Sequence, residues 1–424
     1  MTFLLRGRTA QAALTLMLCA CQPSGAQSPR PAPAPTEQDL AAAYHPGYSV
    51  APGVRSECLG RLVFEVPAQP KFEWGLPKRV RTNEEILGFS RILRGEDVIR
   101  VANVNVVVAA EASRKTILEM QESVDDDKHI ALHRIDENIR IERLSAKDFT
   151  EQLEAPETKA DAVRTADYKK AMQDALNNAE ALAASKREFD HDWHPTDWGL
   201  PNSTGYIAGP TLYAFVLRGG YAFQFMSTGG EGEAPFDQRV VAFKDLLSRF
   251  EYRPLYQVPN KPGLCIPHGF IRDDGQGHFQ AEVSYRFTDS PGVIYTLATA
   301  VEGERNFNPT EPLLEATARS TVAGLLGNGY GRKIQAIGPK GTNVGARPAV
   351  LGGIYTLEGT PGYSLYVGAR GWDHSRVLPF VSLNMRSFDR ETAPDDLKVN
   401  PPAFEQSMKR FELTLSSLRT RKAQ

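Results

Sequence analysis

The spacing of apolar side chains predicts a strand-rich first half of the chain. Leu62, Phe64 and Val66 share one face of a short strand, because successive side chains in a strand point to opposite faces. Residues 99–108 form a longer run rich in β-branched side chains, which favour strands. The elements predicted for this half are strands at 62–66, 99–108, 139–144 and 212–226, the last folded in two at Gly219–Gly220, and helices at 117–123 and 237–250.

The second half repeats this pattern. Residues 280–287 and 293–300 are two apolar runs separated by Ser290-Pro291-Gly292, a sequence that favours a turn. A helix is predicted at 312–326, several strands interrupted by glycine at 334–367, and a final helix at 404–418 after the apolar segment 377–385.

The helices that close the two halves can be aligned residue by residue at a constant offset of 168. Four positions match, because Phe236, Phe243, Leu247 and Phe250 correspond to Phe404, Phe411, Leu415 and Leu418. We therefore predict an α+β fold of two related domains, each a mostly antiparallel sheet with packed helices, that arose by internal duplication. The predicted domains are residues 51–255 and 262–424, joined through the proline-containing segment 252–263.

The first domain is longer than the second, and a helical insert at about 155–193 accounts for the difference. This stretch is rich in alanine and has no β-branched runs. Tyr168, Met172 and Leu176 recur at helical spacing within it, which predicts one apolar helix face.

The N-terminus has the pattern of a secretory signal. Arg6 and Arg8 precede an apolar stretch that is short for a membrane-spanning helix, so residues 1–20 are predicted to be a signal peptide. Leu18-Cys19-Ala20-Cys21 resembles a bacterial lipobox, with Cys21 as the lipidated residue; cleavage after Ala20 or Ala26 without lipidation is the alternative. Residues 21–50 are then a tether, and the protein is predicted to lie in the periplasm, anchored to the outer membrane.

Two cysteines remain in the body of the protein. Cys58 and Cys265 would lie in an oxidising compartment, where thiols tend to pair. The residues leave two readings open, a disulfide between them or two separate buried thiols.

Composition argues against a nucleic-acid partner. The chain has 424 residues with 49 Lys and Arg against 51 Asp and Glu, a net charge of −2, so it has no general excess of positive charge for a phosphate backbone. Apart from the N-terminal stretch, charged residues interrupt every apolar run. Membrane attachment is therefore predicted only through the N-terminal lipid.

No sequence motif predicts catalysis, a metal or a cofactor. A Gly-x-Ser-x-Gly elbow is absent from the sequence, and Gly88-Phe89-Ser90-Arg91 lacks the second glycine. His191 and His194 lack a clear third ligand and are read as part of a surface turn. Asp273-Asp274-Gly275-Gln276-Gly277 lacks the ligand spacing of a calcium loop and is read as a hairpin turn. We therefore predict that the protein is not an enzyme.

Two segments near the insert are candidates for protein recognition. Tyr168 and Met172 lie in the predicted helical insert, and the aromatic residues Trp193, Trp198 and Tyr206 follow it. The alternative reading of each aromatic side chain is packing in the core.

Two short motifs resemble a known family. Glu57-Cys58-Leu59-Gly60-Arg61-Leu62-Val63-Phe64-Glu65-Val66-Pro67 and Pro262-Gly263-Leu264-Cys265-Ile266-Pro267-His268-Gly269-Phe270-Ile271 lie at the two predicted domain starts. They resemble the openings of the two domains in immunity proteins against type VI secretion lipase effectors of the fourth lipase class. The resemblance implies a structural role for the motif residues Gly60, Arg61, Pro67, Gly263 and Gly269.

The same resemblance implies a non-catalytic periplasmic protein. Its two domains would hold a cognate phospholipase effector and hinder opening of the lid or access to the active site. A lipoprotein that binds envelope components or assists assembly is the alternative, and a periplasmic hydrolase with an unrecognised site is a third.

Overall fold

The computed structural model describes most of the chain from Pro35 onward, and these residues belong to one compact unit. The described residues are 35–77, 98–229, 234–274, 277–300, 334–359, 361–372, 375–388 and 399–422. The predicted signal peptide, Cys21, Gly88–Arg91 and the predicted helix at 312–326 lie outside them.

The described helices differ greatly in length. They are α1 (Glu37–Tyr44), α3 (Arg114–Glu154), α4 (Pro156–Lys159), α5 (Ala162–His191), α6 (Phe236–Ser248) and α8 (Phe404–Ser417). A reciprocal capping box starts α1, because the Asp39 N–H donates to Thr36 Oγ1 and the Thr36 N–H donates to the Asp39 carboxylate. None of these helices in the described part of the chain is long and apolar enough to cross a membrane.

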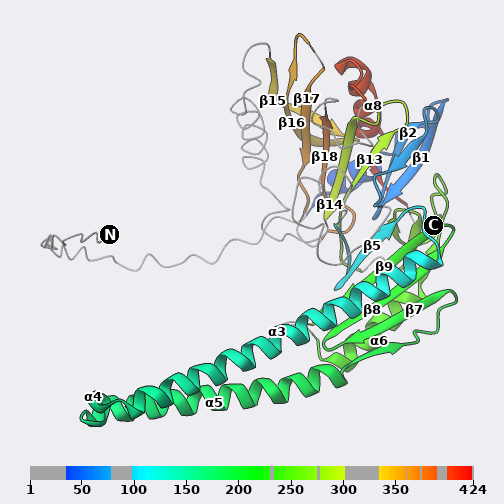
Figure 1. Cartoon of the computed structure of the whole chain (residues 1–424). Helices are drawn as coiled ribbons and strands as arrows, with labels where there is room; N and C mark the ends of the chain where they lie inside the picture. Colours follow the sequence, from blue (N-terminus) through cyan, green and yellow to red (C-terminus); the bar gives the residue numbers. More distant parts are fainter. Residues whose placement is uncertain are drawn as a thin grey trace, which may run out of the picture. The chain divides into compact units, whose positions relative to one another are not determined.

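Helices α3 and α5 run side by side as a hairpin closed by α4 (Figure 1). No glycine or proline interrupts the 41 residues of α3, so nothing local breaks it. Thr116, Ile117, Met120 and Val124 in its first turns are buried, and α3 contacts β8 in the sheet as well as α5. The hairpin is therefore anchored at one end.

One antiparallel sheet of 13 strands crosses both halves of the chain. Its order is β15-β16-β17-β18-β14-β13-β4-β5-β9-β8-β7-β6, and β3 also pairs with β13. The first-half strands are β3 (Phe72–Trp74), β4 (Val98–Val101), β5 (Val104–Ala109), β6 (Trp193–Thr196), β7 (Ser203–Ala208), β8 (Thr211–Arg218) and β9 (Tyr221–Ser227). The second-half strands are β13 (Phe279–Phe287), β14 (Val293–Ala300), β15 (Ile334–Val344), β16 (Arg347–Thr356), β17 (Tyr363–Ala369) and β18 (Phe380–Ser387).

Strand β13 is the seam between the two halves. Its first residues pair with β4, and its last residues pair with β3, both from the first half. Buried aromatic rings fill the core at this seam, among them Phe72 against Tyr285 at 5.0 Å and Tyr285 against Tyr295 at 5.1 Å between ring centres. The Tyr285 hydroxyl donates to Thr414 of α8 over 3.1 Å, so the buried oxygen is satisfied.

Two smaller sheets complete the fold. One consists of β1 (Val54–Leu59), β2 (Leu62–Pro67) and β19 (Arg419–Thr420), and the other of β10 (Phe250–Tyr252), β11 (Gly263–Ile266) and β12 (Gly269–Arg272). Each combines strands from both halves of the chain.

The α+β prediction is confirmed, and so are many local elements. Strands β8 and β9 fold at Gly219 and Gly220, whose positive φ angles of 56° and 81° suit a hairpin turn. Strands β13 and β14, and helices α6 and α8, also lie where they were predicted. The two predicted domains correspond to two halves that share one sheet, and the internal duplication stays a prediction.

Five local predictions were wrong in type or bounds. Residues 139–144 are part of helix α3 rather than a strand, and the short helix at 117–123 is the start of the same helix. The predicted strand 99–108 is two strands, because the chain turns at Ala102, where φ is +51°. The tether was predicted to reach residue 50, but 37–44 form α1, which contacts β16 and β19. Asp273–Gly277 is no hairpin turn, since β12 and β13 on either side belong to different sheets.

Candidate functional site

The two halves of the chain exchange strands reciprocally. Strand β10, which follows α6, pairs with the β11–β12 hairpin of the second half, and β19, which follows α8, pairs with the β1–β2 hairpin of the first half. The registers correspond, because Glu251 lies opposite Phe270 and Arg419 lies opposite Val63, the partners of the two cysteines in their hairpins. We call this arrangement the interlocked hairpins.

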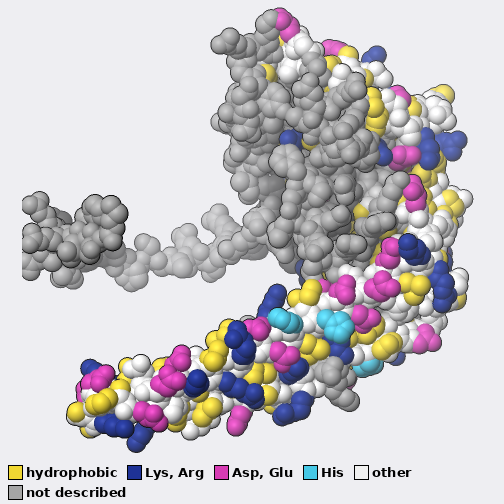
Figure 2. All heavy atoms as spheres, viewed as in Figure 1, with side chains coloured by type: hydrophobic (Ala, Val, Ile, Leu, Met, Phe, Trp, Pro, Cys, Tyr) yellow, Lys and Arg dark blue, Asp and Glu magenta, His cyan; other side chains and the backbone are white. Residues whose placement is uncertain are grey.

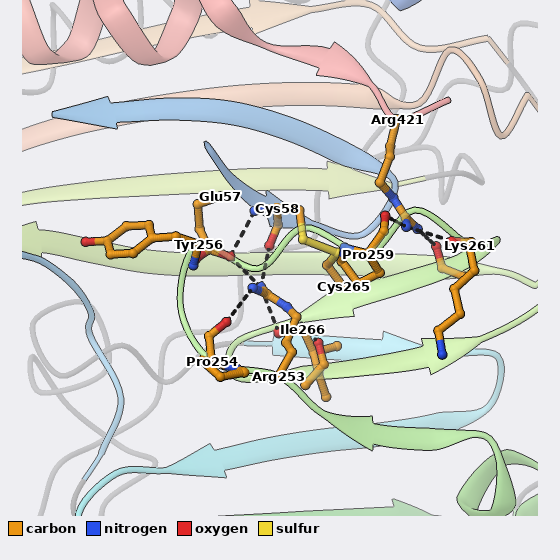
Figure 3. The surroundings of a disulfide bond; sticks show 12 residues. Glu57, Cys58, Arg253, Pro254, Tyr256, Pro259, Lys261, Cys265, Ile266 and Arg421 are labelled. Carbon is orange, nitrogen blue, oxygen red and sulfur yellow. Dashed lines mark hydrogen bonds and ion pairs between the residues drawn. A yellow bond between two sulfur atoms is a disulfide. The ribbon is translucent and has the colours of Figure 1, made fainter. Parts of the chain in front are cut away.

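A disulfide joins the two hairpins at their centre (Figure 3). Cys58 of β1 and Cys265 of β11 are fully buried, 207 residues apart in sequence, with a sulfur–sulfur distance of 2.17 Å. The backbones also meet, since the Gly60 N–H donates to the Cys265 carbonyl over 2.7 Å and the Cys265 N–H donates to the Gly60 carbonyl over 2.9 Å. The bond thus crosslinks two halves that already share strands.

A buried ion pair lies beside the disulfide. The Glu57 side chain is fully buried and the Arg253 side chain is 5% exposed, with 2.5 Å between Arg253 Nη2 and Glu57 Oε1. Glu57 also accepts from the N–H groups of Cys58 and Tyr256, each over 2.9 Å. Arg253 donates to four backbone carbonyls, those of Cys58, Pro254, Ile266 and Gly269. Both charges are therefore compensated and hydrogen-bonded inside the protein.

The motif residues hold these hairpins together. Gly60 has φ +58°, and a Cβ there would lie 2.4 Å from Phe279 Cε1, so only glycine fits. Arg61 forms an ion pair with Asp273 over 3.0 Å and donates to the Gly277 carbonyl. A Cβ at Gly263 would lie 2.4 Å from the Ile271 carbonyl oxygen, and one at Gly269 would lie 2.7 Å from Ile266 Cγ1. Pro67 ends β2.

The aromatic residues predicted to contact a partner are packed inside the protein. Trp198 and Tyr206 are each 8% exposed. Trp198 Nε1 donates to the Tyr213 carbonyl over 2.6 Å, and the Tyr206 hydroxyl donates to Asp125 over 2.6 Å. Trp193 is half-buried with its ring centre 5.0 Å from that of Phe189. Core packing therefore accounts for Trp198 and Tyr206, whereas a partner contact of Trp193 stays a prediction.

The insert residues lie between the two long helices. The ring of Tyr168 packs on Phe149 at 6.1 Å, and Thr150 Oγ1 lies 3.4 Å from the Met172 sulfur. Leu176, predicted for the same face, is instead 39% exposed. Tyr168 and Met172 are half-buried and stabilise the hairpin, and their contact with a partner stays a prediction.

Sequence reasoning missed Glu57 and Arg253. Glu57 stands in the first family motif, but a charged residue in a strand gave no sign of being buried. Arg253 could have been found from the offset of 168, which aligns it with Arg421 just after the two closing helices. The backbone N–H groups of these two arginines donate to equivalent hairpin-turn residues, His268 and Arg61.

Within the described residues, no group of three or more His, Cys, Asp and Glu side chains is placed to hold a metal ion. His194 is exposed, and the side chain of His191 lies outside the described residues.

His268 makes the interlocked hairpins sensitive to acid. It is 5% exposed, stacks on Tyr221 with 3.7 Å between ring centres, and its Nδ1 has no hydrogen-bond partner among the described residues. Burial, together with repulsion from Arg253 and Lys71, lowers the pKa of His268 from 6.5 to about 3. The folded state therefore keeps this imidazole neutral at pH values where the unfolded chain protonates it.

We expect stability to fall as the pH drops from about 6.5 towards 3, because only the unfolded state binds this proton there. At pH 5 the free energy of unfolding should be about 2 kcal/mol lower than at pH 7 because of His268. His268→Asn keeps a residue that tolerates the positive φ of 54° and removes the imidazole. Urea unfolding at both pH values should show a smaller loss for this variant than for the exposed control His133→Asn; equal losses would contradict the assignment.

Comparison with known proteins gives the family of the second half. The family model described as Tle cognate immunity protein 4 C-terminal domain matches residues 257–423. The resemblance to lipase immunity proteins is confirmed. This match begins close to the predicted start of the second domain and spans β11 to β19. No curated protein matches the chain.

The chain is similar to solved structures from type VI secretion systems. The Tle4–Tli4 complex contains a chain that is 13% identical, with a TM-score of 0.50, covering 88% of this chain and 99% of that chain. The immunity protein TplEi of the T6SS from Pseudomonas aeruginosa, complexed with "L" peptide, is 14% identical with a TM-score of 0.49, covering 87% of this chain and 99% of that chain. The likeness to this chain of the Tle4–Tli4 complex extends over both halves, so the first half shares its fold as well.

Proposed function

We propose that this protein binds a phospholipase effector of the type VI secretion system and neutralises it by covering its active site or lid. The match of residues 257–423 to the Tle cognate immunity protein 4 family carries the proposal. Inhibition of this kind requires buried area and shape rather than a reactive group, so the protein itself need catalyse nothing. The N-terminal signal and lipobox pattern support a periplasmic location, where an effector that attacks membrane lipids would meet it.

The α3–α5 hairpin offers apolar surface to a partner. Six of the 12 large hydrophobic side chains that are exposed in the described part of the chain lie on it. They are Leu118, Ile130, Ile141, Leu144, Val163 and Leu176. Figure 2 shows apolar side chains interspersed with both signs of charge along the hairpin. Apolar anchors surrounded by polar groups are typical of protein interfaces.

The hairpin is also long and internally braced. A helix of 41 residues is ~60 Å long, and its outer part contacts only α4 and α5 through pairs such as Phe149 with Tyr168. Lys186 forms an ion pair with Asp136 at 2.6 Å nearer the sheet. A preformed arm loses little conformational entropy on binding, which favours affinity.

The direct test is binding and inhibition by the purified protein. We expect it to capture the lipase encoded beside it, and stoichiometric addition to abolish phospholipid hydrolysis in vitro. If the neighbouring lipase does not bind this protein and stays fully active in its presence, the proposal is contradicted and an envelope-binding role is favoured. If the protein alone hydrolyses any phospholipid of a test panel, the expectation that it is not an enzyme is contradicted.

Shortening the hairpin tests which surface binds. We would replace residues 140–180 with a short Gly-Ser turn, which cuts both helices at the same height and keeps the Asp136–Lys186 pair. Loss of the outer apolar anchors should weaken effector binding about a hundredfold while the rest of the protein folds. The control is Val241→Ser with Leu357→Ser, two exposed apolar residues outside the hairpin, which should bind normally. If the shortened protein binds the effector as tightly as wild type, the interface lies outside the outer part of the hairpin.

A further inference from the structure

A cationic pocket lies beside the interlocked hairpins. Its volume is about 450 Å³, and the charged residues in its lining are all basic: Arg61, Arg376, Arg421 and Lys422. Tyr44 at the end of α1 and Gly263 at the start of β11 also line it. Segments far apart in the sequence thus bring four positive charges to one cavity, although the whole chain has a net charge of −2.

These charges are only partly compensated by the protein. Arg61 has Asp273 as an ion-pair partner at 3.0 Å. Arg421 donates to the backbone carbonyls of Pro259, Lys261 and Gly263, which are neutral acceptors, and forms no ion pair with a carboxylate in the described residues (Figure 3). Lys422 lies over the Tyr44 ring at 5.5 Å. Arg421 and Lys422 therefore leave an excess of positive charge at the pocket.

Two buried donors at the pocket lack an acceptor. Arg61 Nη1 and Arg421 Nε are inaccessible to solvent and have no hydrogen-bond partner among the described residues. Burial, with repulsion from Arg61 and Arg253, lowers the pKa of the Arg421 guanidinium to about 10, although Asp273 acts in the opposite direction. Burial of guanidinium groups whose charge is not neutralised destabilises the folded state, so an anion bound in the pocket would be stabilising through its charge.

We propose that this pocket binds a phosphate group, free or as part of a lipid headgroup. Guanidinium groups match the oxygen geometry of phosphate, and each hydrogen bond between them is charge-assisted. The volume of about 450 Å³ exceeds that of a single phosphate, which leaves room for a substituent on the phosphate. Tyr44, with its cation–π partner Lys422, would lie beside that substituent.

The first experiment measures binding of inorganic phosphate by calorimetry and by thermal unfolding at constant ionic strength. Phosphate should bind and raise the unfolding temperature, whereas chloride should not. Arg376→Gln with Lys422→Gln keeps the buried Arg61 and Arg421 and should weaken phosphate binding about tenfold or more. Lys340→Gln with Lys409→Gln removes two exposed charges elsewhere and is the matched control, with wild-type binding expected.

A second experiment distinguishes the two sources of phosphate. Protein carrying Cys21→Ala, and so no predicted lipid, is sedimented with vesicles of phosphatidylcholine alone or with phosphatidylglycerol added. Pocket-dependent binding to the anionic vesicles assigns the site to a lipid headgroup, and phosphate binding without vesicle binding assigns it to a soluble phosphate. The proposal is overturned if neither probe binds, if chloride is as effective as phosphate, or if the Arg376→Gln, Lys422→Gln protein binds both probes like wild type.

Discussion

Breaking the Cys58–Cys265 disulfide should lower the free energy of unfolding by roughly 3–5 kcal/mol. The bond closes a loop of 207 residues, so its loss allows the unfolded chain many more conformations. Most of the native structure should survive, because the hairpins remain joined by the Gly60–Cys265 backbone pair and by β10 and β19. The oxidised protein should therefore be the more stable form rather than the only folded one.

Urea unfolding with and without a reductant isolates this effect. Reduction keeps both buried sulfur atoms and removes only the crosslink, whereas Cys58→Ala with Cys265→Ala removes the sulfur packing as well. The double variant should be insensitive to reductant and somewhat less stable than reduced wild type. A change of under ~1 kcal/mol on reduction of the wild type would refute the expectation.

Arg253→Met should cost about 3–5 kcal/mol of stability, because it leaves the fully buried Glu57 carboxylate without its partner. It also frees the three carbonyls of the hairpins that Arg253 now satisfies. Adding Glu57→Gln should recover part of the loss, since the buried negative charge is then gone. Equilibrium unfolding of both variants at pH 7 measures the difference.

The matched control for this prediction is Lys147→Met. Lys147 pairs with Glu151 on α3 at 3.6 Å, but the two side chains are 70% and 64% exposed. Water screens such a pair, so its loss should change stability by less than ~1 kcal/mol. Equal costs for Arg253→Met and Lys147→Met would show that burial does not determine the strength of the Glu57 pair.

Local patterns predicted the elements whose partners are near in sequence. The β8–β9 hairpin follows from two apolar runs around Gly219–Gly220, and α8 follows from apolar residues at helical spacing. Ile139 and Ile141 misled the strand prediction, because two β-branched residues at alternate positions suit a strand. In the structure Ile139 is buried and Ile141 is 52% exposed on one long helix, so packing against α5 overrode local preference.

The interlocked hairpins could not be predicted in this way. Strands β10 and β19 have only three and two residues, too few to show any periodicity, and each pairs with a strand from the other half. The sequence also left the pairing of Cys58 with Cys265 open, because it does not show which residues lie close together in the folded protein. The aromatic residues Trp198 and Tyr206 failed as partner contacts for the same reason, since exposure depends on the whole fold.

The order of strands in the β1–β2–β19 sheet also constrains how the chain can fold as it is made. Its first two strands are complete at Pro67, but the third begins at Arg419. A chain that emerges N-terminus first therefore leaves one edge of β2 unpaired until residues 419–420 are available. The pairing of β2 with β19 must then form late. A chain that stops before Arg419 should therefore lack the third strand of this sheet.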